Sequence, residues 1–142
     1  VQRPATNLRF LELEHNEIKN DGFSRIAEAV GGGALPKLTQ LYLDDNPIGA
    51  CVTAATFEAM AANDRFRRLH MLGMASMHSE MSDAGMRSLI TAVEGGQFIP
   101  NAQLNITRSW MSGAHVAVDL AVMLAQACAN AGVVYEIHGY NL

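Results

Sequence analysis

The sequence of 142 residues predicts a single α/β domain. We expect a solenoid with a curved parallel sheet inside and helices outside, built from about four repeats plus a terminal strand. Three observations support this fold class. A short leucine pattern recurs at a constant spacing, each clear copy alternates as a strand does, and two copies continue into a glycine followed by a helix-period segment. Hydrophobic residues make up 49% of the chain, enough for a core at this length.

The first two units carry the clearest repeat. Alignment of residues 8–30 with residues 38–60 superposes Leu8 on Leu38, Leu11 on Leu41, Leu13 on Leu43, Asn16 on Asn46 and Ile18 on Ile48. The last two leucines of each copy alternate with their neighbours, so they face the core from a short strand. An asparagine just after such a strand can satisfy backbone groups at the turn. Asn16 and Asn46 are therefore expected to form a short internal ladder.

The later units are less regular. The third unit begins with Phe66, Leu69 and Met71, and we place an insertion in residues 73–80. Met74 falls at the asparagine position in this alignment, so we expect the ladder to end there. The fourth unit is degenerate. We place the units at about 8–37, 38–65, 66–100 and 101–131, with the terminal strand at about 133–138.

Each unit is expected to return to the next strand through a helix. Residues 22–30 and 85–93 carry apolar side chains at the spacing of one helix face, and the alanine-rich segment 49–63 holds another helix. The glycines of 31–33 and 95–96 then end their helices, because glycine readily takes the left-handed conformation found after helix ends.

These residues resemble the leucine-rich repeat, whose pattern is L-x-x-L-x-L-x-x-N-x-I. Gly22 and Gly85, each followed by a helix-period segment, resemble its long helical type, the ribonuclease-inhibitor class. The resemblance is closest over 7–48, good over 66–94 and weak from residue 100 onward. It implies protein recognition, and hence a non-enzymatic protein–protein interaction module. GTPase-activating proteins for Ran and nucleotide-sensing receptors share this repeat type, so a fragment of either is a minor alternative.

The concave sheet face is the first candidate site. The alignment gives three rows of side chains across the sheet: Phe10, Gln40, Arg68, Gln103, Val134; then Glu12, Tyr42, His70, Asn105, Glu136; then Glu14, Asp44, Leu72, Thr107, His138. We expect a protein partner to contact Phe10, Glu12, Glu14, Tyr42, Asp44, Arg68 and His70. Acidic first strands and a basic third strand can orient a charged partner, with Phe10 and Tyr42 as aromatic anchors. The same charges also fit a solvated face with cross-strand pairs such as Asp44 with Arg68.

The segment 114–131 is the second candidate site. Its polar residues fall in a narrow arc of the helix, whereas a helix outside a solitary solenoid should be polar over about half its circumference. The alternative function is therefore a structural or accessory subunit of a large multiprotein assembly. It would dock through the apolar face formed by Val116, Leu120, Met123 and Leu124. Cover by the fourth unit would account for the same composition, as would an arc of alanines that tolerates water.

The methionine- and histidine-rich segment 70–81 raises the question of a metal. Thioethers with imidazole suit Cu(I), but methionine also fills irregular gaps in a core, so we expect a flexible, partner-adapting loop here. The histidines are scattered, and the motifs of serine hydrolases, zinc proteases and phosphate loops are absent. We therefore assign no catalytic residue, no metal site and no cofactor.

Charge and composition exclude further classes. A net charge of −4, from 10 basic and 14 acidic residues, gives no electrostatic footprint for nucleic acid. No apolar run reaches the roughly 18 residues of a transmembrane segment. Cys51 and Cys128 fit no metal or redox spacing, and with no export signal they favour an intracellular, cytoplasmic location. An organelle protein trimmed after import would look the same. Val1 at the start suggests a processed product or a fragment of a longer chain.

Overall fold

The computed structural model describes residues 7–48, 67–74, 83–107 and 118–138. The elements within these ranges, in chain order, are β1 (Phe10–Glu12), α1 (Asn20–Gly31), β2 (Gln40–Tyr42), β3 (Met71–Met74), α3 (Asp83–Glu94), β4 (Gln103–Thr107), α5 (Val118–Ala131) and β5 (Val134–His138). The predicted α/β class is therefore confirmed. The expected helix in 49–63 lies outside the described residues.

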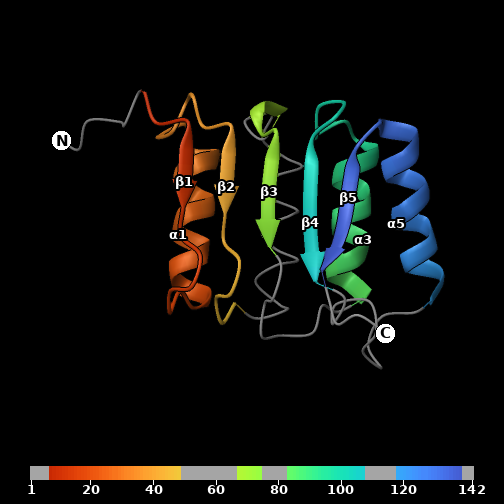
Figure 1. Ribbon diagram of the computed structural model, residues 1–142, viewed down its shortest axis with the longest axis horizontal. Helices are drawn as coiled ribbons and strands as arrows, with labels where there is room; N and C mark the ends of the chain where they lie inside the picture. Colours follow the sequence, from red (N-terminus) through yellow and green to blue (C-terminus); the bar gives the residue numbers. More distant parts are fainter. Residues whose placement is uncertain (1–6, 49–66, 75–82, 108–117, 139–142) are drawn as a thin grey trace.

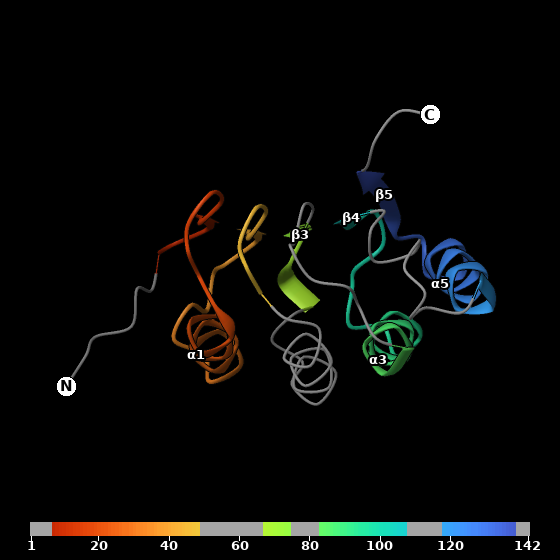
Figure 2. The same ribbon diagram turned by 90° about the horizontal axis from the view of Figure 1, so that it is seen from below.

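The five strands form one parallel sheet in the order β1-β2-β3-β4-β5, so each strand lies beside its neighbours in the chain (Figure 1). Parallel neighbours require a crossover connection, and α1 and α3 lie in such connections. The helices α1, α3 and α5 lie on one side of the sheet (Figure 2). Among the described elements, none covers the opposite side, which we call the open face.

The core lies between the sheet and the helices. Leu11, Leu41, Leu72 and Leu104 occupy one register row across β1 to β4, and all point to the helix side. Leu41, Leu72 and Leu104 are each at most 3% exposed, and burial of such a side chain contributes about 1.5–3 kcal/mol. Leu11 is only partly buried because β1 is the edge strand and has one neighbour.

Asn46 joins the first unit to the second. Its Nδ2 group donates hydrogen bonds to the carbonyl oxygens of Leu13 at 2.8 Å and Leu43 at 2.9 Å, and its Oδ1 accepts the backbone N–H of Ile18 at 3.1 Å. Asn16 makes the equivalent bonds within its own turn, to the carbonyl oxygens of Leu13 and Glu14. The expected use of both amides is confirmed. Only Asn46 is internal, because Asn16 is exposed at the end of the stack.

The described helices end in the same turn. Gly33, Gly96 and Gly132 follow α1, α3 and α5 with positive φ angles of 82°, 71° and 68°. In each case the next N–H returns to a carbonyl five residues back, as in Ala34 N to Ala29 O at 2.9 Å. This is the Schellman arrangement, which satisfies carbonyl groups at a helix end and turns the chain toward the following strand. The predicted role of the glycines at 31–33 and 95–96 is confirmed.

The third strand lies three residues later in the chain than the sequence alignment predicted. Gln40 pairs with Met71 rather than Arg68, and Leu41 pairs with Leu72 rather than Leu69. Leu69 instead precedes the strand as Leu38 does, and Met74 takes the last core position, both 1% exposed. Met74 therefore does not occupy the asparagine position, and the insertion cannot begin at residue 73. Two overlapping frames fit the leucine pattern here, and the observed frame buries Leu72 and Met74.

Candidate functional site

The open face carries the predicted contact residues of the first two strands. Phe10 lies beside Gln40, and Glu12 lies beside Tyr42. Glu14 and Asp44 follow directly after these strands, where the pairing continues through the Leu13 N–H to the Tyr42 carbonyl at 3.0 Å. Because side chains alternate along a strand, all of these residues point away from the leucine row. The structure thus brings together five of the seven predicted contacts: Phe10, Glu12, Glu14, Tyr42 and Asp44.

Tyr42 lies at the centre of an acidic group of side chains. Its pKa is raised above 10.0, first by burial of the phenol and then by the negative charges of Glu12, Glu14 and Asp44. Its hydroxyl donates a hydrogen bond to Gln40 Oε1 at 2.8 Å. We call Glu12, Glu14, Tyr42 and Asp44 the acidic patch. Its phenol stays protonated at neutral pH, so the patch offers carboxylate acceptors around an aromatic ring.

Gly73 extends the acidic patch over the third strand. It is the register partner of Tyr42, and a Cβ atom at this position would collide with Asp44 Oδ2 and lie 3.1 Å from Tyr42 Cδ1. The side chains of Tyr42 and Asp44 therefore lie over the β3 backbone, where only a glycine leaves room for them. The alignment missed this role because it placed His70 beside Tyr42. The available signal was a glycine between the two core residues Leu72 and Met74.

Arg68 and His70 do not belong to the open-face rows, which corrects the prediction. Both precede β3, and the His70 N–H donates to the Thr39 carbonyl at 2.7 Å. Arg68 Nη1 donates to the Pro36 carbonyl at 2.6 Å. Asp44 follows the end of β2, so it lies at the opposite edge of the sheet from Arg68. The expected Asp44–Arg68 pair is therefore not formed.

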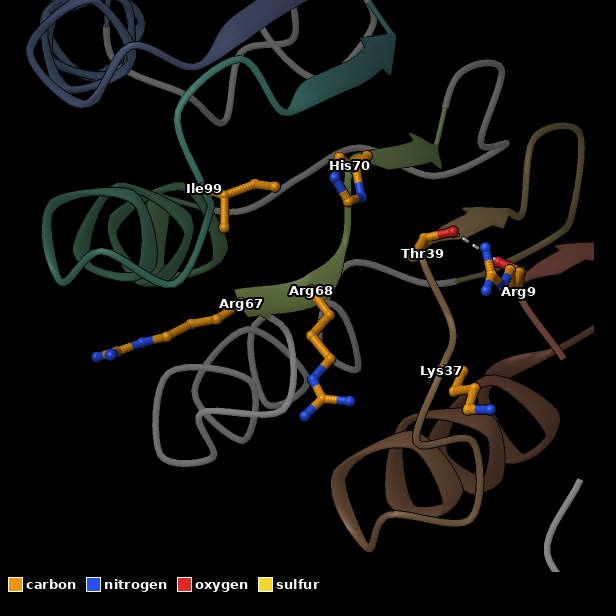
Figure 3. Close-up of a pocket in the computed structure, with 7 residues that line it drawn as sticks. All are labelled: Arg9, Lys37, Thr39, Arg67, Arg68, His70 and Ile99. Atoms are coloured by element: carbon orange, nitrogen blue, oxygen red, sulfur yellow. Dashed lines mark hydrogen bonds between the residues drawn. The ribbon is translucent and has the colours of Figure 1, made fainter. Parts of the chain in front are cut away.

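The displaced basic residues instead form a pocket where the strands begin. Its volume is about 360 Å³, and its lining consists of Arg9, Lys37, Thr39, Arg67, Arg68, His70 and Ile99 (Figure 3). We call it the basic pocket. Four of the chain's 10 lysines and arginines line it, and no carboxylate does. Sequence reasoning missed it because it depends on how loops of successive units stack, and the third unit was placed in the wrong register.

The predicted docking face on α5 is split between the core and the surface. Leu120 and Leu124 are 1% and 0% exposed and belong to the core, so their assignment to a docking surface is wrong. Met123 is exposed, as is its neighbour Val122, whereas Val116 lies outside the described residues. The helix is more apolar than expected because α5 packs beside α3 as well as against the sheet (Figure 2).

Metal and thiol chemistry find little support in the described part of the chain. Within those residues, no group of three histidine, cysteine or carboxylate side chains could hold a metal ion. Most of the segment 70–81 lies outside them. Burial raises the pKa of the Cys128 thiol to about 11, so this thiol stays protonated at neutral pH and is a poor nucleophile. None of the described helices has the length and apolar character needed to cross a membrane.

Comparisons of the chain with protein-family models, with curated proteins and with solved structures found no match. Function is therefore inferred from the geometry and chemistry of the site. Two surfaces are available for this inference: the acidic patch with Phe10 on the open face, and the basic pocket at the edge where the strands begin.

Proposed function

We propose that the protein is a leucine-rich repeat solenoid of the ribonuclease-inhibitor-like class and acts as a non-enzymatic protein-binding module. The sequential parallel sheet, the shared helix-ending turn and the bridging amide of Asn46 support this fold assignment. In such a solenoid the sheet face without helices is the surface that meets a partner. Here that surface is the open face.

The exposure of Phe10 beside the acidic patch is the observation that carries the proposal. Its ring is 54% exposed, although it sits on an ordered strand and pairs with Gln40. Aromatic side chains at a surface of ordered backbone are typical anchors of protein interfaces. Together with Glu12, Glu14 and Asp44, the ring suits a partner that presents lysine or arginine next to an apolar group.

Binding follows from complementarity on a surface formed before the partner arrives. The side chains of Tyr42 and Asp44 are held over Gly73, and Tyr42 is fixed by its bond to Gln40. A surface ordered in advance loses less conformational entropy on association, so more of the contact energy appears as affinity. The carboxylates attract a basic partner and set its orientation.

A capture experiment with matched variants tests this function. The tagged chain is incubated with cell extract, and bound proteins are quantified by mass spectrometry. We expect Glu12→Lys combined with Tyr42→Ala to lose the specific partner, because the change removes an aromatic group and reverses a charge within the acidic patch. Glu28→Lys on the exposed face of α1 should retain it. Equal capture by both variants, with unchanged thermal unfolding, contradicts a contact through the open face.

A second candidate function is docking as an accessory subunit through α5. Val122 and Met123, which are 64% and 45% exposed, form an apolar pair on its outer side. In the same capture experiment, Val122→Asp with Met123→Asp tests this face. Loss of the partner in this variant, with retention in the acidic-patch variant, moves the interface from the open face to the helix.

A further inference from the structure

The basic pocket contains a row of three side chains at the beginnings of neighbouring strands. The Thr39 N–H donates to the Arg9 carbonyl at 2.8 Å, and the His70 N–H donates to the Thr39 carbonyl at 2.7 Å. Arg9, Thr39 and His70 therefore follow one another at the strand spacing of about 4.8 Å. A guanidinium, a hydroxyl and an imidazole line the same side of the pocket.

Two further cations are held in place beside this row. Lys37 Nζ donates to Asn7 Oδ1 at 2.9 Å, and Arg68 Nη1 donates to the Pro36 carbonyl at 2.6 Å. Both acceptors are uncharged, so these bonds orient the cations without neutralising them. Figure 3 shows Lys37 and Arg68 extending to the same side of the row. In the described ranges, neither side chain, nor that of Arg9, forms an ion pair with a carboxylate.

The charge of the pocket contrasts with the charge of the whole chain. The protein carries a net charge of −4, yet Arg9, Lys37, Arg67 and Arg68 line one cavity that has no acidic residue. Like charges gathered in this way repel one another unless an anion lies between them. Ile99 adds an apolar wall, and the volume of about 360 Å³ falls at the lower end of the range for small-ligand sites.

We propose that the basic pocket binds a phosphate monoester. Such a group carries a charge of about −1.5 to −2 at neutral pH and several strong acceptor oxygens, which matches a cluster of cations better than a single carboxylate does. Arg9 and Arg68 supply the forked N–H donors that suit phosphate oxygens, and Lys37 supplies a compact positive charge. Ile99 contacts the apolar part of the ester.

This site is separate from the surface assigned to protein binding. None of the residues in the basic pocket belongs to the acidic patch, and the two lie at opposite edges of the sheet. Loss of phosphate binding therefore leaves the open-face proposal intact, and the reverse also holds.

Titration of the whole chain with phenyl phosphate, followed by the backbone amide shifts of Thr39 and His70, tests the charge requirement. Benzoate is the matched probe, because it carries the same ring on a carboxylate. We expect saturable binding of phenyl phosphate, about tenfold tighter than that of benzoate and weakened by added salt. No saturable shift, or equal affinity for the two anions, overturns the proposal.

Variants locate the binding. Lys37→Gln with Arg68→Gln should weaken phenyl phosphate binding by about tenfold or more, because two charged donors are lost. Arg87→Gln on the exposed face of α3 removes one charge outside the pocket and should leave the affinity within about twofold. If the double variant does not fold, Lys37→Gln alone is compared with Arg87→Gln. Equal effects of pocket and control variants overturn the site.

A last comparison separates two sources of the same chemical group. A short phosphotyrosine peptide represents a modified side chain of a protein, and glucose 6-phosphate represents a free metabolite. Tighter binding of the peptide assigns the pocket to a phosphorylated protein, and tighter binding of the sugar assigns it to a metabolite. Failure of both to bind contradicts a phosphate monoester site.

Discussion

At the scale of single residues, two asparagines in equivalent positions have different weight. Asn46 is 0% exposed and bonds to backbone groups of two units, whereas Asn16 bonds only within its own turn and is exposed. The leucine and asparagine pattern predicted both positions. It could not predict the difference, because burial depends on whether another unit stacks in front.

Replacing each asparagine by alanine measures this difference. We expect Asn46→Ala to lower the free energy of unfolding by about 3 kcal/mol, because the Ile18 N–H and buried carbonyls lose their partner. Asn16→Ala should cost less than about 1 kcal/mol, since water replaces its hydrogen bonds. Urea unfolding curves of the two variants give both values. Equal losses would mean that Asn46 does not bridge the units.

At the scale of elements, the apolar character of α5 has a different cause from the one that its sequence suggests. Helical periodicity groups Leu120, Met123 and Leu124 on one docking face, because all three are apolar and close in the helix. The structure divides them, since α5 has two buried sides, one against the sheet and one beside α3. The number of neighbours around a terminal helix is a property of the stack, so helical periodicity alone does not contain it.

Alanine substitutions on α5 separate core from surface. Leu124→Ala should destabilise the fold by about 2–5 kcal/mol, because it leaves a cavity among fully buried residues. Val122→Ala should change stability by at most about 0.5 kcal/mol, since its side chain is 64% exposed. Thermal and urea unfolding measure both. A small effect of Leu124→Ala would contradict the packing of α5 against the core.

At the scale of the whole molecule, the arrangement of charge follows from the register of the third strand. The repeat spacing predicted the parallel sheet, the helix sequence and the acidic patch, because these depend on local pattern. It did not predict the basic pocket. In the predicted frame Arg68 and His70 crossed the open face, and a shift of three residues moves them to the edge where the strands begin.

Both proposed sites therefore depend on the pairing of β2 with β3. With Tyr42 opposite Gly73, the acidic patch lies on the open face and the basic pocket lies at the other edge. With Tyr42 opposite His70, acidic and basic groups would mix on one surface. The two arrangements differ in which protons lie next to the Tyr42 ring.

The most direct test is a nuclear Overhauser measurement on the isotope-labelled protein in solution. The position of a Cβ at Gly73 lies 3.1 Å from Tyr42 Cδ1, so we predict a strong cross-peak between the Tyr42 ring protons and the Gly73 α-protons. A cross-peak from the Tyr42 ring to the His70 side chain, with none to Gly73, would contradict the register and both sites built on it.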